Sequence, residues 1–353
     1  MNGALVDVLV STYNEERAIE ACLDAILAQS APVAVTVIDG GSSDGTVAVL
    51  RERARQDPRI AVIADGIHRT LPAALNLGLA MTGRPFVAKV DARTFLAPDF
   101  LERSLAVLSS GENIACAGGA PQQFGDTAFG AGLAKARTSR FGVGGSQYAD
   151  HRTRADVDTI QCGVYRRSAL DAVGAFDPEL QYGEDEELNW RLRSVGLRLV
   201  RDASIRFRYQ TRPTWEKAFA QYRNYGRARI AVAQRHPEFL RPYHFAPAAA
   251  LVGAAALAVA APFSTAAFLL LAAGAGTYTA GSAIAAVVAA GRDRSAIAAT
   301  ALAFTALHLG YAIGTIDGVL NTLRVRNTVP EPRHTVPTAT SESDRPHIPN
   351  TTG

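Results

Sequence analysis

Short apolar runs alternate with segments of helical periodicity over the first third of the chain. Four apolar runs predict short strands: 6–10, 33–38, 60–63 and 86–90. Three segments repeat apolar residues at helical spacing: 19–27, 47–55 and 71–81. Because strand and helix alternate through short links, the pattern predicts an α/β fold, Rossmann-like, with a mostly parallel sheet and helices on both faces.

The pattern changes near residue 245, after which charge almost disappears. Three apolar runs follow, each near or above membrane-spanning length: 246–263, 265–290 and 296–320. Their many Ala and Gly residues also suit a soluble core, but three such runs in succession favour a membrane. We therefore expect an α/β domain over 1–245, a membrane region of two or three apolar helices over 246–325, and a disordered tail over 326–353.

The charges that flank these runs leave the number of spans open. Arg292 and Arg294 follow the second run, and the positive-inside rule places them in the cytoplasm together with the N-terminal domain. A third span would put Arg324 and Arg326 outside, which that rule disfavours. The third run, which contains Asp317, is therefore either a span or a re-entrant or interfacial segment.

Composition excludes several classes of protein. A net charge of +3 on 353 residues gives no electrostatic signature of nucleic-acid binding. The three cysteines are scattered and odd in number, which argues for a reducing compartment and against a disulfide framework or a zinc site. Residues 1–10 contain an acid and no basic segment, so no signal peptide is predicted and the first domain is expected in the cytoplasm.

Polar residues follow three of the predicted strands. Asn14-Glu15 follows the first, Asp39 the second, and Asp91 the strand at 86–90. In open parallel sheets the carboxyl ends of the strands share one edge, and ligands bind there. No G-x-G-x-x-G follows the first strand, so the dinucleotide fingerprint is missing. The three acids therefore point to a different ligand at that edge.

Asp91 and Asp39 each have two interpretations, one as a ligand-binding group and one as an ordinary turn residue. Asp91 can hold a divalent cation against a ligand's phosphates, or it simply begins a turn. Asp39 can accept the imide N–H of a uracil or thymine ring, with Gly40-Gly41 allowing close backbone approach, or it too forms a turn. For Asp44, which precedes a predicted helix, we favour a helix cap.

Several motifs taken together resemble the nucleotide-sugar half of the family-2 glycosyltransferases. They are Ser11-Thr12-Tyr13-Asn14-Glu15-Glu16, Asp39-Gly40-Gly41-Ser42-Ser43-Asp44-Gly45-Thr46, and Asn76 ahead of Val90-Asp91-Ala92-Arg93. The resemblance implies a GT-A fold with a nucleotide diphosphate sugar as substrate. It implies that Asn14, Glu15 and Asp39 meet the nucleobase, that Tyr13 and Asn76 also belong to the substrate site, and that Asp91 is the acid of the family's D-x-D that binds Mg²⁺ or Mn²⁺.

Arg93 departs from that pattern, because most of the family has Asp at this position. Either the metal rests on Asp91, the diphosphate and water, or Arg93 partly replaces a metal charge with its own. A solvated surface charge is the plainer alternative. The departure is mild if the chain belongs to a branch that commonly has Asp-Ala-His here.

Four consecutive acids, Glu184 to Glu187, open a predicted amphipathic helix. Acids favour a helix N-terminus through the dipole, which accounts for two or three of them. The run also resembles the family's Glu-Asp catalytic motif and its following Leu-Asn-x-Arg pattern. By that resemblance Asp185 is the general base that takes the acceptor's hydroxyl proton during inverting transfer, and Glu184 is the next candidate.

A basic segment precedes the next predicted helix, which starts at Thr214. Arg212 in this segment is expected to reach the donor diphosphate. The helix itself either belongs to the catalytic domain or lies on the membrane surface, where its arginines would meet anionic headgroups.

Within the family, the pattern from Phe141 through Arg212, with His308 to Gly314, most resembles the succinoglycan-biosynthesis glucosyltransferase branch, over about residues 4–320. The resemblance implies an inverting enzyme of the inner membrane, with its catalytic domain in the cytoplasm. It would move a hexose, with UDP the favoured carrier, to a lipid-linked or growing glycan in exopolysaccharide or cell-envelope synthesis.

Two alternatives stay open. One is a polyprenyl-phosphate sugar synthase, which needs a basic cluster near the membrane, for which Arg206, Arg208 and Arg212 are available. The other is an inactive membrane scaffold that keeps the nucleotide fold, against which the intact acids Asp39, Asp91 and Asp185 argue.

Overall fold

The computed structural model describes residues 6–144 and 153–328. An eight-stranded sheet forms the centre of the α/β domain, in the order β3-β2-β1-β4-β9-β6-β10-β8. Its strands are β1 (Val6–Thr12), β2 (Val33–Asp39), β3 (Ile60–Ile63), β4 (Phe86–Asp91), β6 (Ile114–Gly118), β8 (Ala155–Asp156), β9 (Gly163–Arg166) and β10 (Arg198–Arg201). The predicted fold class is confirmed: β1 to β4 pair in parallel, as do β6 and β10.

Helices cover both faces of this sheet, which follows from strands that are apolar on both faces. In β1, Val8 and Val10 face the helices α1 and α4, whereas Leu9 between them faces α3 and α8. The helices of this domain are α1 (Ile19–Leu27), α2 (Thr46–Gln56), α3 (Leu71–Ala80), α4 (Phe100–Ser109), α7 (Arg167–Val173) and α8 (Glu184–Ser194).

The alternating pattern did not predict two features of the sheet. β9 lies between β4 and β6 and runs antiparallel to both. A second, three-stranded sheet has the order β5-β11-β7, with β5 (Thr94–Leu96), β7 (Pro121–Phe124) and β11 (Phe207–Gln210). Both features bring together segments that are distant along the chain, and local periodicity carries no information about such pairing.

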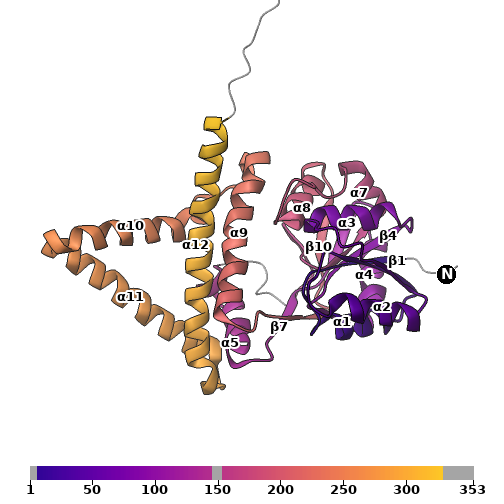
Figure 1. Ribbon diagram of the computed structural model, residues 1–353, viewed down its shortest axis with the longest axis horizontal. Coiled ribbons are helices and arrows are strands. Elements are labelled where there is room, and N and C mark those ends of the chain that lie inside the picture. Colours follow the sequence, from indigo (N-terminus) through magenta and orange to yellow (C-terminus); the bar gives the residue numbers. More distant parts are fainter. Residues whose placement is uncertain (1–5, 145–152, 329–353) are drawn as a thin grey trace, which may run out of the picture.

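The remaining helices form a separate layer beside the α/β domain (Figure 1). They are α5 (Ala128–Arg137), α6 (Arg140–Val143), α9 (Trp215–Arg235), α10 (Ala246–Ala260), α11 (Thr265–Ala290) and α12 (Ile297–Thr328). Short 3-10 turns at Pro237–Phe239, Pro242–Phe245, Ala261–Phe263 and Arg294–Ala296 connect them. α12 lies along α9, whereas α10 and α11 extend away from the α/β domain as an arm (Figure 1).

The predicted apolar runs all become helices. Three stretches are long and apolar enough to cross a membrane by length and composition: Pro242–Phe263, Thr265–Ala290 and Arg294–Arg324. α12 continues to Thr328, three residues past the expected end of the membrane region at 325. The expected disordered tail from 329 onward lies outside the described residues.

Candidate active site

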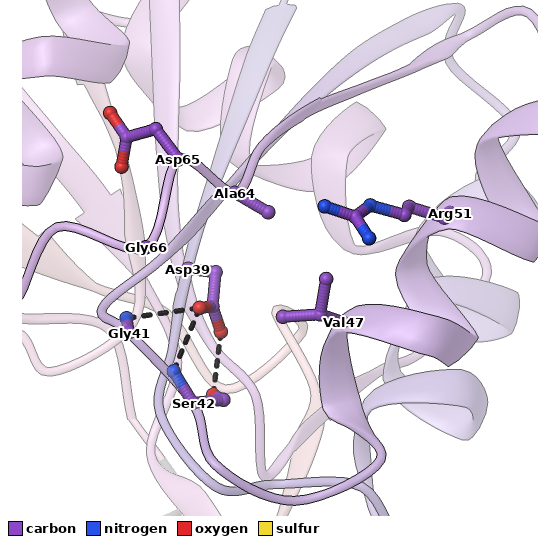
Figure 2. A pocket seen from close by; sticks show the side chains of 8 residues that line it. All are labelled: Asp39, Gly41, Ser42, Val47, Arg51, Ala64, Asp65 and Gly66. Atoms are coloured by element: carbon purple, nitrogen blue, oxygen red, sulfur yellow. Dashed lines mark hydrogen bonds between the residues drawn. The ribbon is translucent and has the colours of Figure 1, made fainter.

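A pocket of about 480 Å³ opens at the carboxyl end of β2 (Figure 2). It is lined by Asp39, Gly41, Ser42, Val47, Arg51, Ala64, Asp65 and Gly66. Figure 2 shows Val47 and Arg51, both on α2, projecting toward Asp39 and Ala64 across the space. An acid at the floor with apolar and cationic walls suits a flat polar ring.

Asp39 is fixed in this pocket by the loop that follows it. Its Oδ2 accepts hydrogen bonds from Gly41 N at 2.9 Å and Ser42 N at 2.8 Å, and its Oδ1 accepts one from the Ser42 hydroxyl. Gly41 has a φ of +87°, a conformation that glycine adopts without strain. A carboxylate offers about four acceptor positions, so Oδ1 keeps one for a ligand.

The end of β1 braces the same loop. Asn14, itself in the left-handed region with φ 54°, accepts a hydrogen bond from Ser43 N at 2.8 Å and donates its own N–H to the Ser42 hydroxyl. Next to it, the half-exposed Tyr13 ring meets His68 edge to face, at 5.6 Å between centroids. Tyr13 therefore presents a free aromatic surface close to the Asp39 loop, whereas Asn14 holds that loop.

Glu15 forms ion pairs with Arg93 and Arg212, two arginines that lie far apart in the sequence. Its carboxylate receives Arg93 through both oxygens, at 2.9 and 2.7 Å, and Arg212 Nη1 lies 3.2 Å from Oε1. Arg93 is 14% exposed, so it is not a solvated surface charge. Glu15 is thus committed to orienting two guanidinium groups, and the cluster keeps one net positive charge beside the end of β4.

Asp91 and Lys89 lie two residues apart on β4, so both side chains point to the face that α8 covers. Lys89 is buried, with its Nζ 3.4 Å from Asp91 Oδ1 and 2.9 Å from Glu184 Oε1. Burial alone would lower the pKa of Lys89, but the carboxylates of Asp91, Glu184 and Asp185 raise it well above its usual value. Sequence analysis missed Lys89, although a lysine within an apolar strand was a visible signal.

The described residues offer a cation little more than Asp91. They contain no group of three or more His, Cys, Asp or Glu side chains that could hold a metal by themselves. Asp91 is 30% exposed, so its carboxylate is accessible from the strand edge. Mg²⁺ is often held by one or two carboxylates plus substrate phosphates and water, and this donor set fits a cation of that kind.

Three of the four acids that begin α8 have ion-pair partners. Glu184 pairs with Lys89, Glu186 with Arg229 at 2.9 Å, and Glu187 with Arg191 at 2.7 Å and His236 at 2.9 Å. Within the described chain, Asp185 has no ion-pair partner, and its Oδ1 accepts only the N–H of Glu186. The acidic run is therefore more than a set of equivalent helix caps.

The surroundings of Asp185 raise its pKa to about 7. Burial is the largest cause, because the protein desolvates the carboxylate, and repulsion by Glu184 adds to it. Lys89 opposes the shift, whereas Glu186 and Asp91 reinforce it. A carboxyl group that titrates near neutral pH has the basicity that a general base needs.

Asn76 and Asp44 brace the structure. Asn76 uses both ends of its amide on Phe176, donating to the carbonyl at 2.7 Å and accepting the N–H at 3.1 Å. It is not among the residues that line the Asp39 pocket, so its substrate-binding role stays a prediction. Asp44 accepts the N–H of Thr46 at 3.0 Å, but the N-cap of α2 is the following residue, Gly45, so Asp44 is not the helix cap that the sequence favoured.

The chain resembles known proteins over most of its length. The family model described as glycosyl transferase family 2 matches residues 7–174. The succinoglycan biosynthesis protein ExoA of Rhizobium meliloti is 30% identical over 238 residues, which cover 65% of this chain and 70% of that protein. The chain belongs to glycosyltransferase family 2. The same match places it in the succinoglycan-biosynthesis branch predicted from its motifs.

Two further proteins are similar to this family-2 glycosyltransferase. The dolichyl N-acetyl-alpha-D-glucosaminyl phosphate 3-beta-D-2,3-diacetamido-2,3-dideoxy-beta-D-glucuronosyltransferase of Methanococcus voltae is 24% identical, over 64% of this chain and 72% of that protein. The mannosyltransferase PcManGT of Pyrobaculum calidifontis, solved with GDP-Man and Mn²⁺, aligns with a TM-score of 0.60 at 22% identity, over 90% of this chain and 88% of that one. The latter likeness shows the fold, which is GT-A.

The family match and the site overlap only in part. Residues 7–174 of this family-2 glycosyltransferase contain the ends of β1, β2 and β4, with Asp39 and Asp91. α8 and Arg212 lie beyond the matched range. The catalytic role of Asp185 and the donor-binding roles of the other predicted residues therefore stay predictions, supported by their convergence at one sheet edge.

Proposed function

We propose that this family-2 glycosyltransferase is an inverting hexosyltransferase that takes its sugar from a nucleotide diphosphate donor. One observation carries the proposal: the Asp39 pocket, Asp91 and Asp185 meet at the carboxyl edge of one sheet. Asp39 and Asp91 pair in register with Thr12 and Ser11 at the end of β1. They lie two strand spacings apart, about 10 Å, a separation that suits the base and the phosphates of one nucleotide.

In this proposal the donor's base enters the Asp39 pocket and its diphosphate lies across the end of β4. The remaining acceptor position on Asp39 Oδ1 favours a base with an imide N–H, which is why UDP is our preferred carrier. Tyr13 supplies a surface for stacking. Arg93 and Arg212, oriented by Glu15, face the phosphates with fixed positive charge.

The proposed cofactor is Mg²⁺ or Mn²⁺, with Asp91 as its protein ligand. Bound there, the cation would neutralise charge on the departing nucleotide diphosphate. Lys89 holds the Asp91 carboxylate from inside the protein at 3.4 Å, which leaves its outer side for the ligand. Arg93, which stands where most of the family has a second acid, would supply part of the positive charge that a fully coordinated metal otherwise provides.

Asp185 is the proposed general base. It is the one acid of its run without an ion pair in the described chain, and its pKa of about 7 lets it accept a proton near neutral pH. It would remove the proton from the acceptor hydroxyl while that oxygen attacks C1 of the sugar and the bond from C1 to the nucleoside diphosphate breaks on the opposite face, which inverts the centre. Glu184 is a poorer candidate because Lys89 already holds it at 2.9 Å.

The proposed acceptor is a lipid-linked or growing glycan at the cytoplasmic face of the inner membrane. Similarity to a succinoglycan biosynthesis protein and to a transferase named for a dolichyl-linked sugar supports this class. A bare polyprenyl phosphate would need a basic cluster, but Arg206 lies 3.7 Å from Asp99 and Arg208 stacks on Phe124. Because Arg212 pairs with Glu15, the three arginines Arg206, Arg208 and Arg212 do not form one site.

A panel of nucleotide sugars on the detergent-solubilised full chain tests the proposal. We expect release of one nucleoside diphosphate from one hexose donor, accelerated by a lipid-linked glycan acceptor, with the anomeric centre inverted in the product. Transfer to polyprenyl phosphate alone would support the synthase alternative. Absence of turnover and of binding for every donor would support an inactive scaffold instead.

A further inference from the structure

α12 is joined to α9 by a stripe of glycines. Gly310, Gly314 and Gly318 follow one another at four-residue spacing and face α9. A Cβ on Gly314 would lie 1.9 Å from the Arg223 carbonyl oxygen, and one on Gly226 of α9 would lie 2.4 Å from the Tyr311 carbonyl oxygen. The backbones of α9 and α12 are therefore in direct contact, and the two helices form one closely packed pair.

α9 carries six charged side chains: Glu216, Lys217, Arg223, Arg227, Arg229 and Arg235. Arg223 and Arg227 both pair with Asp317 of α12, at 2.6 and 2.7 Å. If α12 crossed the bilayer, α9 would enter it too. Charged side chains are costly to place in lipid, so six of them on α9 would oppose its insertion strongly.

α9 is also anchored to the α/β domain on its other side. Arg229 pairs with Glu186 of α8, and Arg235 pairs with Asp177. A Cβ on Gly183, the residue before α8, would lie 3.1 Å from Ala228 of α9. α12 is thus attached through α9 to the catalytic domain, and its position is fixed relative to that water-soluble part.

The α10–α11 arm has the opposite character. Residues 246–291 contain no charged side chain. The arm is exposed along most of its length, with Val259, Phe263 and Val288 at 74, 89 and 76%. Its apex, Ala261–Phe263, points away from the α/β domain, and both of its ends return to the layer of α5 and α12 (Figure 1). Lys135 of α5 pairs with Asp293 just after α11, at 3.4 Å.

We propose that the α10–α11 arm alone enters the bilayer. It enters from the side of the membrane on which the α/β domain lies and returns to that same side, while α12 lies along the membrane surface. Both ends of the arm carry charge, with Arg241 before it and Arg292 to Arg294 after it, as expected where a chain enters and leaves lipid. The occupant of the exposed surface is lipid hydrocarbon, because the arm offers a protein partner neither charge nor a polar rim. The end of α12 is then on the catalytic side.

Protease protection tests this topology without reference to sugar transfer. An epitope tag with a protease site, appended after Gly353, is followed in intact spheroplasts and in inverted membrane vesicles. We expect the tag and the α/β domain to be cut together, in the same one of the two preparations. A tag cut in the preparation that protects the α/β domain would mean that α12 crosses, and would overturn the proposal. Removal of the chain by alkaline carbonate would overturn it as well, since no arm would then be inserted.

A matched pair of glycine variants tests the α9–α12 contact. Gly314→Leu inserts a side chain between the two backbones, whereas Gly274→Leu on α11 faces open space. We expect Gly314→Leu to lower the melting temperature of the membrane-extracted protein by several degrees and Gly274→Leu to leave it unchanged. Gly314→Ala provides a milder version if the leucine variant does not accumulate. The reverse order of effects would mean that α12 packs in the membrane with α11, contrary to the proposal.

Discussion

The ammonium group of Lys89 lies 2.9 Å from Glu184 Oε1, and both side chains are buried. This ion pair joins β4, which ends at Asp91, to the first turn of α8, which holds Asp185. The proposed phosphate side of the site and the proposed base are therefore held together by one buried contact. Its strength depends on both partners, since each would otherwise be an unpaired buried charge.

Replacement of Lys89 by methionine is expected to destabilise the protein, because Glu184 would be left buried without a partner. Breaking a buried pair from one side typically costs about 3–5 kcal/mol. Thermal unfolding of Lys89→Met, Lys89→Met with Glu184→Gln, and the exposed control Lys217→Met measures this. The double variant should recover much of the lost stability but not the transfer rate. Equal stability of Lys89→Met and the parent would contradict the assigned pair.

Asp185→Asn is expected to lower turnover by at least about a hundredfold, since the amide keeps the size and the N–H acceptor but cannot take a proton. Donor binding and the fold should be close to normal. Glu186→Gln is the matched control on the same helix turn, because Glu186 is paired with Arg229. Single-turnover kinetics with a melting curve for each variant separates the two roles. If Asp185→Asn transfers sugar at the parent rate, the base lies elsewhere.

The pKa of about 7 for Asp185 predicts how activity depends on pH. Below pH 7 the carboxyl is protonated and cannot act as a base, so kcat/KM should fall about tenfold per pH unit on acidification. The stability of the fold should depend on pH in the opposite direction from the activity. A carboxyl whose folded pKa is raised favours folding below its unfolded pKa, and this contribution is lost as pH rises through about 7.

The variant Asp185→Asn is the control for the predicted pH dependence. Asp185→Asn should be at least as stable as the parent at about pH 8, because it removes a destabilising ionised group. Its residual activity should also lose the acidic limb of the pH profile. An acidic limb that persists in this variant would assign the titration to another group.

Glu15 and Arg93 form an ion pair with one hydrogen bond, from Arg93 Nε to Glu15 Oε1, and a double-mutant cycle can measure it. Both side chains are mostly buried, at 11 and 14% exposure, so their coupling in unfolding should reach about 1–3 kcal/mol. Arg93→Gln should also weaken donor binding, because Glu15 would then hold only Arg212. Denaturant unfolding and donor titration of Glu15→Gln, Arg93→Gln and the double variant supply the data. Additive effects would show that the pair does not act as a unit.

Asp91→Asn is expected to weaken donor binding and abolish transfer, and EDTA should do the same to the parent protein. Asp65→Asn is a useful control, since Asp65 lines the base pocket but pairs with Arg69 and is remote from the phosphates in our proposal. Donor titration with and without added Mg²⁺ or Mn²⁺ makes the comparison. Full activity in EDTA would mean that Arg93 and Arg212 provide the charge without a metal.

Much of the fold could be predicted from the sequence, because its signals are local. The strand at 60–63 is found at the predicted residues, and α2 and α3 begin and end within one residue of their predicted bounds. Alternating apolar strands and helices require a parallel sheet covered on both faces, and the acids at strand ends then share one edge. The apolar runs after residue 245 likewise predicted three long helices.

Only the tertiary structure decided which charges meet. The pairs Lys89–Glu184, Glu15–Arg93 and Asp317–Arg223 link residues about 80 to 95 positions apart, and no periodicity predicts such contacts. Helix-dipole reasoning did not distinguish the four acids of α8, and only a family resemblance singled out Asp185, whereas packing gave the other three partners and raised the pKa of Asp185. A pKa depends on burial and neighbouring charge, which exist only after folding.

The glycine stripe of α12 is a second feature of this kind. By sequence alone it is compatible with a membrane span, whereas its contact with the charged helix α9 is a property of the folded chain.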